Sequence, residues 1–225
     1  MDILYEDNHI IAVNKEVSDI VQGDKTGDEP LSEKVKSYIK KKYNKPGAVF
    51  LGVTHRLDRP VSGVLLFAKT SKSLTRLNEM FLKKELKKTY WAIVKEKPPK
   101  VSDTINHFLV RNQKKNKSFA SDKEVKNSKL ASLTYTLLAS ADNYYLLEID
   151  LHTGRHHQIR SQLSKMGVPV KGDLKYGFPR SNPDGGISLH ARRVEFIHPV
   201  KKEKVIITAE PPKDALWDYF ISIVS

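Results

Sequence analysis

Short apolar runs typical of β-strands recur along this chain and outnumber its helical patterns, which limits the folds it can adopt. Strand patterns fall at residues 3–5, 9–13, 64–68, 89–94, 130–138, 144–151, 191–197 and 205–209. Helical spacing appears at residues 31–43, after Ser71 as a possible cap, between Gly154 and Gly167, and from about Lys213. Because strands and helices do not alternate strictly, we predict an α+β fold with a mixed, mainly antiparallel sheet flanked by helices. With no repeat and no convincing linker, a single domain over residues 1–225 is expected.

Composition excludes several kinds of chemistry. The 225 residues include no cysteine, which rules out disulfides, cysteine nucleophiles, cysteine-based zinc sites and iron–sulfur clusters, and favours a reducing, cytoplasmic location. No apolar run approaches the roughly 18 to 20 residues of a membrane span, and the acidic N-terminus does not resemble a signal peptide. The 39 Lys and Arg residues against 26 Asp and Glu give a net charge of +13, so an anionic partner is expected.

A polar segment directly before the apolar strand at 64–68 is the first candidate site. It runs His55-Arg56-Leu57-Asp58-Arg59-Pro60-Val61-Ser62-Gly63. Loops held by a rigid strand often carry catalytic groups, and Asp58 between two arginines could be held ionised as a nucleophile or base. The alternative is a structural aspartate that caps a turn, with both arginines as solvated surface charge.

A second candidate surrounds the expected start of the helix that ends near Gly167. Ile159, Leu163 and Met166 recur at helical spacing and are predicted to face the core, which leaves Arg155, His156 and His157 around the helix N-terminus as a possible phosphate site.

A metal site in the same segment is disfavoured. His152 and His156 are four residues apart, but Gly154 lies between them at a predicted turn and the His-Glu-x-x-His pattern is missing. No metal is therefore predicted.

Aromatic and basic residues meet in a third segment, Lys88-Thr89-Tyr90-Trp91-Ala92-Ile93-Val94. Tyr90 and Trp91, next to the lysines at 83, 84, 87 and 88, suit a surface that stacks bases, although Tyr and Trp in a strand are often core residues. Residues 111–129 carry seven basic side chains and few apolar anchors, so an exposed loop or irregular hairpin is expected there. Glycine-rich nucleotide loops and the Gly-x-Ser-x-Gly elbow are missing.

Taken together, these segments resemble the RluA-type pseudouridine synthases from about Ile3 to Pro199. The resemblance is carried, in the order of that family, by His55-Arg56-Leu57-Asp58, Ser62-Gly63-Val64-Leu65-Leu66-Phe67-Ala68-Lys69, Lys88-Thr89-Tyr90, Gly154-Arg155-His156-His157-Gln158-Ile159-Arg160, Gly172-Asp173-x-Lys175-Tyr176-Gly177, Leu189-His190-Ala191 and His198-Pro199. Val61 replaces the family's usual Thr, and Lys15-Glu16-Val17-Ser18 lacks its usual Lys-Pro, which bears on substrate fit more than on chemistry.

The resemblance implies an isomerase that converts uridine to pseudouridine in RNA without a cofactor, on the pseudouridine synthase catalytic fold. Asp58 would be the catalytic carboxylate, Arg160 would pair with it and keep it ionised, and Tyr90 would stack on the uracil. The target base must leave the helix, and Arg56 would fill the vacated space. The residues expected to contact RNA are His55, Arg56, Arg59, Arg155, His156 and Leu189.

The expected partner is a stem-loop of ribosomal or transfer RNA, with no membrane and no metal. The chain begins in the catalytic region, so no separate N-terminal RNA-binding domain is expected, and a monomer is favoured. Two alternatives stay open. One is a non-catalytic RNA-binding or ribosome-assembly protein on the same fold, and the other is a metal-dependent nuclease that uses Asp58 and the histidines.

Overall fold

The computed structural model describes residues 1–23 and 27–224, and the chain forms two compact units. The first unit comprises Met1–Leu86 and Ala191–Glu210, and the second comprises Lys87–His190 and Pro211–Ser225. Each unit combines helices with antiparallel strand pairs, which confirms the predicted α+β class. The expectation of a single domain stays a prediction.

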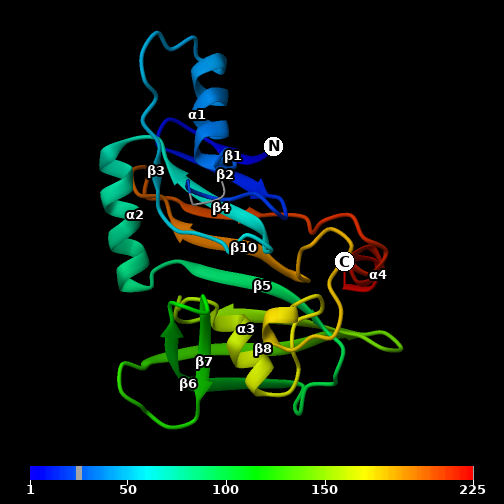
Figure 1. The fold of residues 1–225 in the computed structure, drawn as a ribbon. Helices are drawn as coiled ribbons and strands as arrows, with labels where there is room; N and C mark the ends of the chain where they lie inside the picture. Colours follow the sequence, from blue (N-terminus) through cyan, green and yellow to red (C-terminus); the bar gives the residue numbers. More distant parts are fainter. Residues whose placement is uncertain (24–26, 225) are drawn as a thin grey trace. The chain divides into compact units, whose positions relative to one another are not determined.

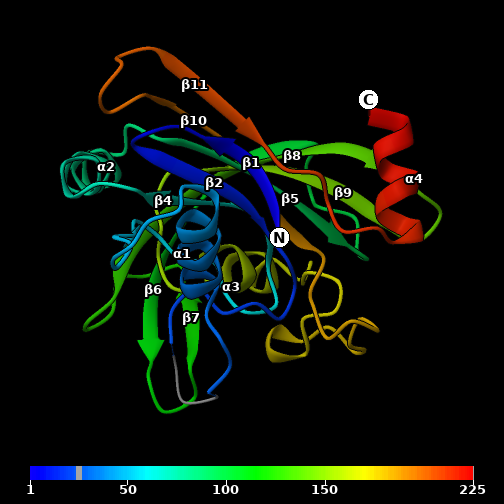
Figure 2. The same ribbon diagram turned by 90° about the horizontal axis from the view of Figure 1, so that it is seen from above.

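The first unit is built around the strand order β1-β2-β4-β10 (Figure 1). β3 also pairs with β4, and β11 runs alongside β10 (Figure 2). Its elements are β1 (Asp2–Glu6), β2 (Ile10–Lys15), α1 (Leu31–Lys42), β3 (Gly52–Val53), β4 (Ser62–Ala68), α2 (Ser71–Lys83), β10 (Leu189–Ile197) and β11 (Lys204–Thr208). The first two residues of β10 belong to the second unit. The strands predicted at residues 3–5 and 9–13 are confirmed as β1 and β2, which pair antiparallel.

Helix α2 covers one face of these strands. Leu77 and Met80 are buried against apolar residues of β2, β4, β10 and β11, and burial of such side chains stabilises the unit. The helix does not begin as the sequence predicts. Thr70, not Ser71, is the N-cap: its hydroxyl accepts a hydrogen bond from the Ser73 amide, and the Ser73 hydroxyl accepts one from the Thr70 amide. The sequence offers adjacent Thr and Ser candidates, and this reciprocal pair selects the first.

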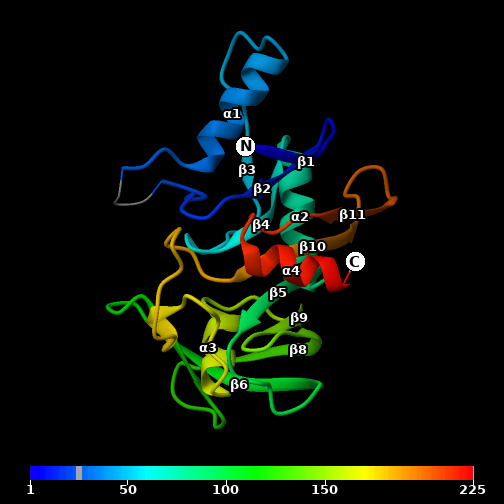
Figure 3. The same ribbon diagram turned by 90° about the vertical axis from the view of Figure 1, so that its right-hand side faces the viewer.

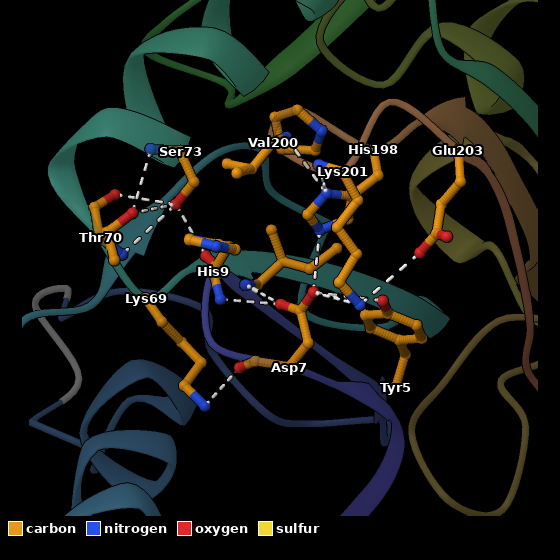
Figure 4. A network of polar contacts seen from close by, with 12 residues as sticks. Tyr5, Asp7, His9, Lys69, Thr70, Ser73, His198, Val200, Lys201 and Glu203 are labelled. Carbon is orange, nitrogen blue, oxygen red and sulfur yellow. Dashed lines mark hydrogen bonds and ion pairs between the residues drawn. The ribbon is translucent and has the colours of Figure 1, made fainter.

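A polar network holds the β1–β2 turn against the segment that follows β10 (Figure 4). Asp7 Oδ1 accepts hydrogen bonds from the His9 and Ile10 amides. His198 is fully buried, and its Nδ1 accepts from the Val200 and Lys201 amides at 3.1 and 2.9 Å. Its Nε2 lies 3.0 Å from Asp7 Oδ2, too oblique for a good hydrogen bond. With Nδ1 as a double acceptor, His198 is held in its neutral form.

The second unit has the strand order β5-β9-β8-β6-β7, and Figure 3 shows β5, β9, β8 and β6 side by side. Its elements are β5 (Lys87–Val94), β6 (Ser102–Asn112), β7 (Lys117–Ser121), β8 (Lys129–Ser140), β9 (Tyr145–Leu151), α3 (Gln158–Lys165), the 3-10 helix η1 (Leu174–Tyr176) and α4 (Ala215–Val224). Trp91 and Ile93 pack with Trp217 and Phe220 of α4. Trp91 is therefore a core residue, the alternative to base stacking that the sequence left open.

The hairpin of β6 and β7 is the main element that the sequence predicted incompletely. β6 was not expected, and the segment expected as a loop or irregular hairpin contains β7, paired from Phe108↔Ser121 to Asn112↔Lys117. Along β6 only His107 and Leu109 are buried, and the other positions are exposed or partly buried, so the apolar signal of this strand is weak. Pairing with β7 and β8 supplies the strand hydrogen bonds instead.

Among the described residues, no helix is both long and apolar enough to span a membrane.

Candidate active site

Asp58 lies in the loop between β3 and β4, and the backbone of this loop is closely tied. The Val61 amide donates to the Asp58 carbonyl at 3.0 Å, which closes a turn. The Asp58 side chain is partly exposed. The sequence correctly places this residue in a polar loop directly before a buried strand.

Lys15, at the end of β2, holds this loop in place through hydrogen bonds to its backbone. Its side chain is fully buried, and Nζ donates to the carbonyl oxygens of Glu16, Arg59 and Val61 at 2.9, 3.1 and 2.7 Å. Burial lowers the pKa of Lys15 to about 8, although the charges of Asp19 and Asp58 oppose that shift. Lys15 therefore places a positive charge beside Asp58 and fixes the carbonyl groups on its C-terminal side.

Sequence reasoning noted Lys15 only as part of a departure from the family pattern. The available signal was a lysine two residues after the apolar run of β2 and within the same strand, since a buried charge must find internal partners.

His55, Arg56 and Arg59, which precede and follow Asp58, have surroundings that the sequence did not predict. Arg59 Nη2 forms an ion pair with Asp28 at 2.7 Å, and both side chains are about half exposed. Arg56 is exposed. His55 Nε2 accepts a hydrogen bond from the Leu66 amide of β4, and its ring lies 5.0 Å from that of Phe81. The RNA-binding roles of His55, Arg56 and Arg59 stay predictions.

The backbone conformation and close packing at position 63 explain why a glycine follows Ser62 in this motif. Its φ is +116°, a backbone angle that residues with a side chain rarely adopt. An added Cβ would lie 2.6 Å from the Ala191 nitrogen and still closer to the Ala191 carbonyl oxygen. Only glycine allows β4 and β10 to approach this closely directly after the Asp58 loop.

Tyr90 lies in the middle of β5, in the second unit, and is 9% exposed. It pairs with Ile149 of β9. Since neighbouring side chains alternate between the faces of a strand and Trp91 packs against α4, Tyr90 belongs to the opposite face. The strand thus places Trp91 and Tyr90 on opposite faces, with Trp91 in the core beside α4.

Arg160 is a buried residue of α3, and its partner in this unit is Asp173. Arg160 Nε and Nη2 donate to Asp173 Oδ2 and Oδ1 at 2.7 and 2.9 Å, with the two side chains 6% and 1% exposed. The sequence placed Asp173 in a family motif without giving it a role. The expected pairing of Arg160 with Asp58, which belongs to the other unit, stays a prediction.

The proposed phosphate-binding residues lie directly before α3, around its N-terminus as predicted. The helix begins at Gln158, and His157 before it has left-handed backbone angles with φ 51°. Arg155 is exposed, and its Nε donates to the Leu130 carbonyl. His156 contacts Ser118 Oγ at 2.9 Å and stacks on His157 at 3.8 Å. The helix starts later than predicted because Gly154 and the left-handed His157 keep this stretch in a turn.

Leu189, the last expected contact residue, is buried at the start of β10. His152 Nε2 contacts Thr134 Oγ1 at 2.8 Å. In residues 1–23 and 27–224, no cluster of three or more His, Asp or Glu side chains has an arrangement that could hold a metal ion.

Comparison with known proteins gives a consistent result. A family model described as RNA pseudouridylate synthase matches residues 9–165. An uncharacterized RNA pseudouridine synthase of Synechocystis is 33% identical over 97% of this chain and 67% of its own length. Ribosomal large subunit pseudouridine synthase C of Rickettsia bellii is 34% identical over 93% of this chain and 68% of its own.

A solved structure shares the fold. Human RNA Pseudouridylate Synthase Domain Containing 4 superimposes with a TM-score of 0.81 at 21% identity, covering 97% of this chain and 92% of that one. Fold and motifs together define an isomerase that acts on RNA. The chain belongs to the RNA pseudouridine synthases of the RluA type, as the sequence predicts.

Proposed function

We propose that this enzyme isomerises a specific uridine within a stem-loop of ribosomal RNA, with transfer RNA as the other candidate substrate. Similarity to relatives named for the ribosomal large subunit supports the first choice. The net charge of +13 supports a polyanionic substrate, since lysine and arginine contacts to phosphates supply affinity without sequence information.

In this proposal Asp58 is the catalytic carboxylate. The reaction breaks the bond from C1′ to N1, turns the uracil, and joins C5 to the same sugar carbon, while the C5 proton is lost and N1 gains one, so nothing is consumed. Asp58 either adds to the base or sugar, or takes a proton from the ribose. Both roles need an ionised carboxylate in a fixed position. The observation that carries the assignment is the loop of Asp58, whose backbone is tied to the buried ammonium of Lys15.

Tyr90 and Arg160 act on the same uridine as Asp58. Tyr90 stacks on the flipped uracil and assists removal of the C5 proton, and Arg160 pairs with the Asp58 carboxylate. Arg56 braces the space that the base leaves, while His55, Arg59, Arg155, His156 and Leu189 contact the RNA around it. The exposed positions of Arg56 and Arg155 support their contact with phosphates or bases.

The deciding experiment deletes the gene and maps pseudouridine across the stable RNAs of the cell. We expect a defined position to be lost and to return with wild-type protein but not with Asp58→Asn or Asp58→Ala. A deletion that loses no pseudouridine would instead favour a non-catalytic RNA-binding or ribosome-assembly protein. Return of the position with Asp58→Asn would remove Asp58 from the catalytic role.

A further inference from the structure

Asp173 and Tyr176 surround Arg160 on two sides. Asp173 takes the Nε and Nη2 edge of the guanidinium in a two-pronged ion pair, and the Tyr176 ring lies 5.1 Å from the guanidinium carbon. A two-pronged carboxylate fixes the plane of a guanidinium as well as its position, and an aromatic face limits its tilt. Arg160 is therefore held in one orientation by groups of its own unit.

The turn that carries both residues is itself rigid. Gly172 and Gly177 have φ of +86° and +100°, and a Cβ on Gly172 would lie 2.7 Å from Asn182 Cγ. The Asp173 carbonyl accepts from the Tyr176 and Phe178 amides, both at 3.0 Å. Asp173 and Tyr176 consequently have fixed positions relative to each other.

Tyr176 also connects this turn to β7. Its hydroxyl accepts from the Ser118 amide at 2.8 Å, donates to the Ser118 carbonyl at 3.1 Å, and lies 3.0 Å from His157 Nδ1. Two more links join the same segments, from Lys117 Nζ to the Lys175 carbonyl and from Lys175 Nζ to the Asn116 carbonyl. The turn is thus anchored by a strand and not only by its own backbone.

We propose that Asp173 is a positioning residue for catalysis: with Tyr176 it fixes the Arg160 guanidinium before RNA binds, so that the remaining donors of Arg160 meet the catalytic carboxylate. A guanidinium has five N–H donors, more than one carboxylate can take up. A buried arginine without a partner would be costly, and Asp173 lowers that cost while it takes up two of the five N–H donors. The inference rests on the proposed role of Arg160.

The test compares Asp173→Asn with wild type in single-turnover pseudouridine formation, using ribosomal RNA from the deletion strain. We expect the rate to fall about 100-fold, the loss that a misplacement of about 1 Å can cause. The Kd for the same RNA should change by less than about threefold, because phosphate contacts dominate affinity. A rate within about threefold of wild type would overturn the proposal.

A double-mutant cycle separates positioning from general damage. If Asp173 acts through Arg160, Arg160→Lys with Asp173→Asn should be no slower than Arg160→Lys alone. Multiplied effects would overturn the proposal. Asp173→Glu keeps the negative charge but shifts the position of the carboxylate, so its rate should lie between those of wild type and Asp173→Asn. If circular dichroism shows that Asp173→Asn is unfolded, Asp173→Glu replaces it in the cycle.

Glu6→Gln is the matched control. Glu6 has another largely buried carboxylate, bound by Lys42 and Lys69 at 2.7 Å each, and it belongs to the first unit, whereas Asp173 and Arg160 belong to the second. Its rate should stay near that of wild type, and a loss equal to that of Asp173→Asn would overturn the specific role of Asp173. Full activity of Arg160→Ala would overturn the role of Arg160 and this inference together, whereas a failed proposal of function shows as an inactive wild type.

Discussion

The ammonium nitrogen of Lys15 lies 2.7 Å from the carbonyl oxygen of Val61, a residue 46 positions later in the chain. The contact joins the end of the second strand to the loop that carries Asp58. Because the lysine also binds the Arg59 carbonyl, the carbonyl groups one and three residues after Asp58 share one buried cation.

Replacing Lys15 with methionine should slow pseudouridine formation by about tenfold or more, since loss of the tether allows the Asp58 loop to move. The wild-type rate should also fall as pH rises through about 8, where Lys15 loses its proton and can donate only two hydrogen bonds. Lys15→Met should lack this alkaline decline. Lys36→Met, on the surface of α1, is the control and should behave as wild type. A Lys15→Met profile identical to wild type would contradict the prediction.

Substitutions of Tyr90 should separate stacking from proton transfer. Tyr90→Phe keeps the ring, so RNA affinity should stay near wild type while the rate drops. Tyr90→Leu should weaken binding of the target base by about 1–3 kcal/mol, the usual contribution of one stacked base. Trp91→Phe, on the α4 side of the same strand, should lower stability without lowering affinity. Equal activity of wild type and both Tyr90 variants would remove Tyr90 from the site.

Gly63→Ala should destabilise the protein by about 3 kcal/mol or more, because a Cβ there combines an unfavourable φ with overlap onto β10. Denaturant unfolding measures the change. Gly47→Ala serves as the control, since nothing lies within 4 Å of a Cβ at that position. Similar stabilities of the two variants would show that β4 and β10 can separate at low cost.

His198 should make stability depend on pH. Its pKa is lowered by burial and by the electrostatic effects of Lys201 and His9, although Asp7 and Glu203 oppose the shift. Below the ordinary histidine pKa of about 6.5 the unfolded chain binds a proton that the folded protein resists, so the free energy of unfolding should fall as the solution is acidified.

Calorimetric Tm values between pH 8 and pH 5 test this dependence. His198→Asn retains an acceptor but does not titrate, so its Tm should fall less steeply than that of wild type. His152→Asn, which changes an exposed histidine, should keep the wild-type slope. An unchanged slope in His198→Asn would assign the acid sensitivity to other groups.

Local patterns were enough to predict much of the fold. Alternating and continuous apolar runs located most strands, as in β2 and β4, and helical spacing located α1 within one residue of its end. The apolar pattern did not predict β6, in which few side chains are buried. Local sequence also did not distinguish Thr70 from Ser71 as the N-cap of α2.

The sequence by itself determined the fold class, the family and the motif that contains Asp58, because each depends on residue order and short-range periodicity. Only the tertiary structure decided which partner each buried charge has. Lys15 binds carbonyl groups of a distant loop, and Arg160 binds Asp173 across an intervening turn. A buried charge must be compensated by whatever polar group the fold brings within hydrogen-bond distance, and that distance is set by packing between segments far apart in the chain.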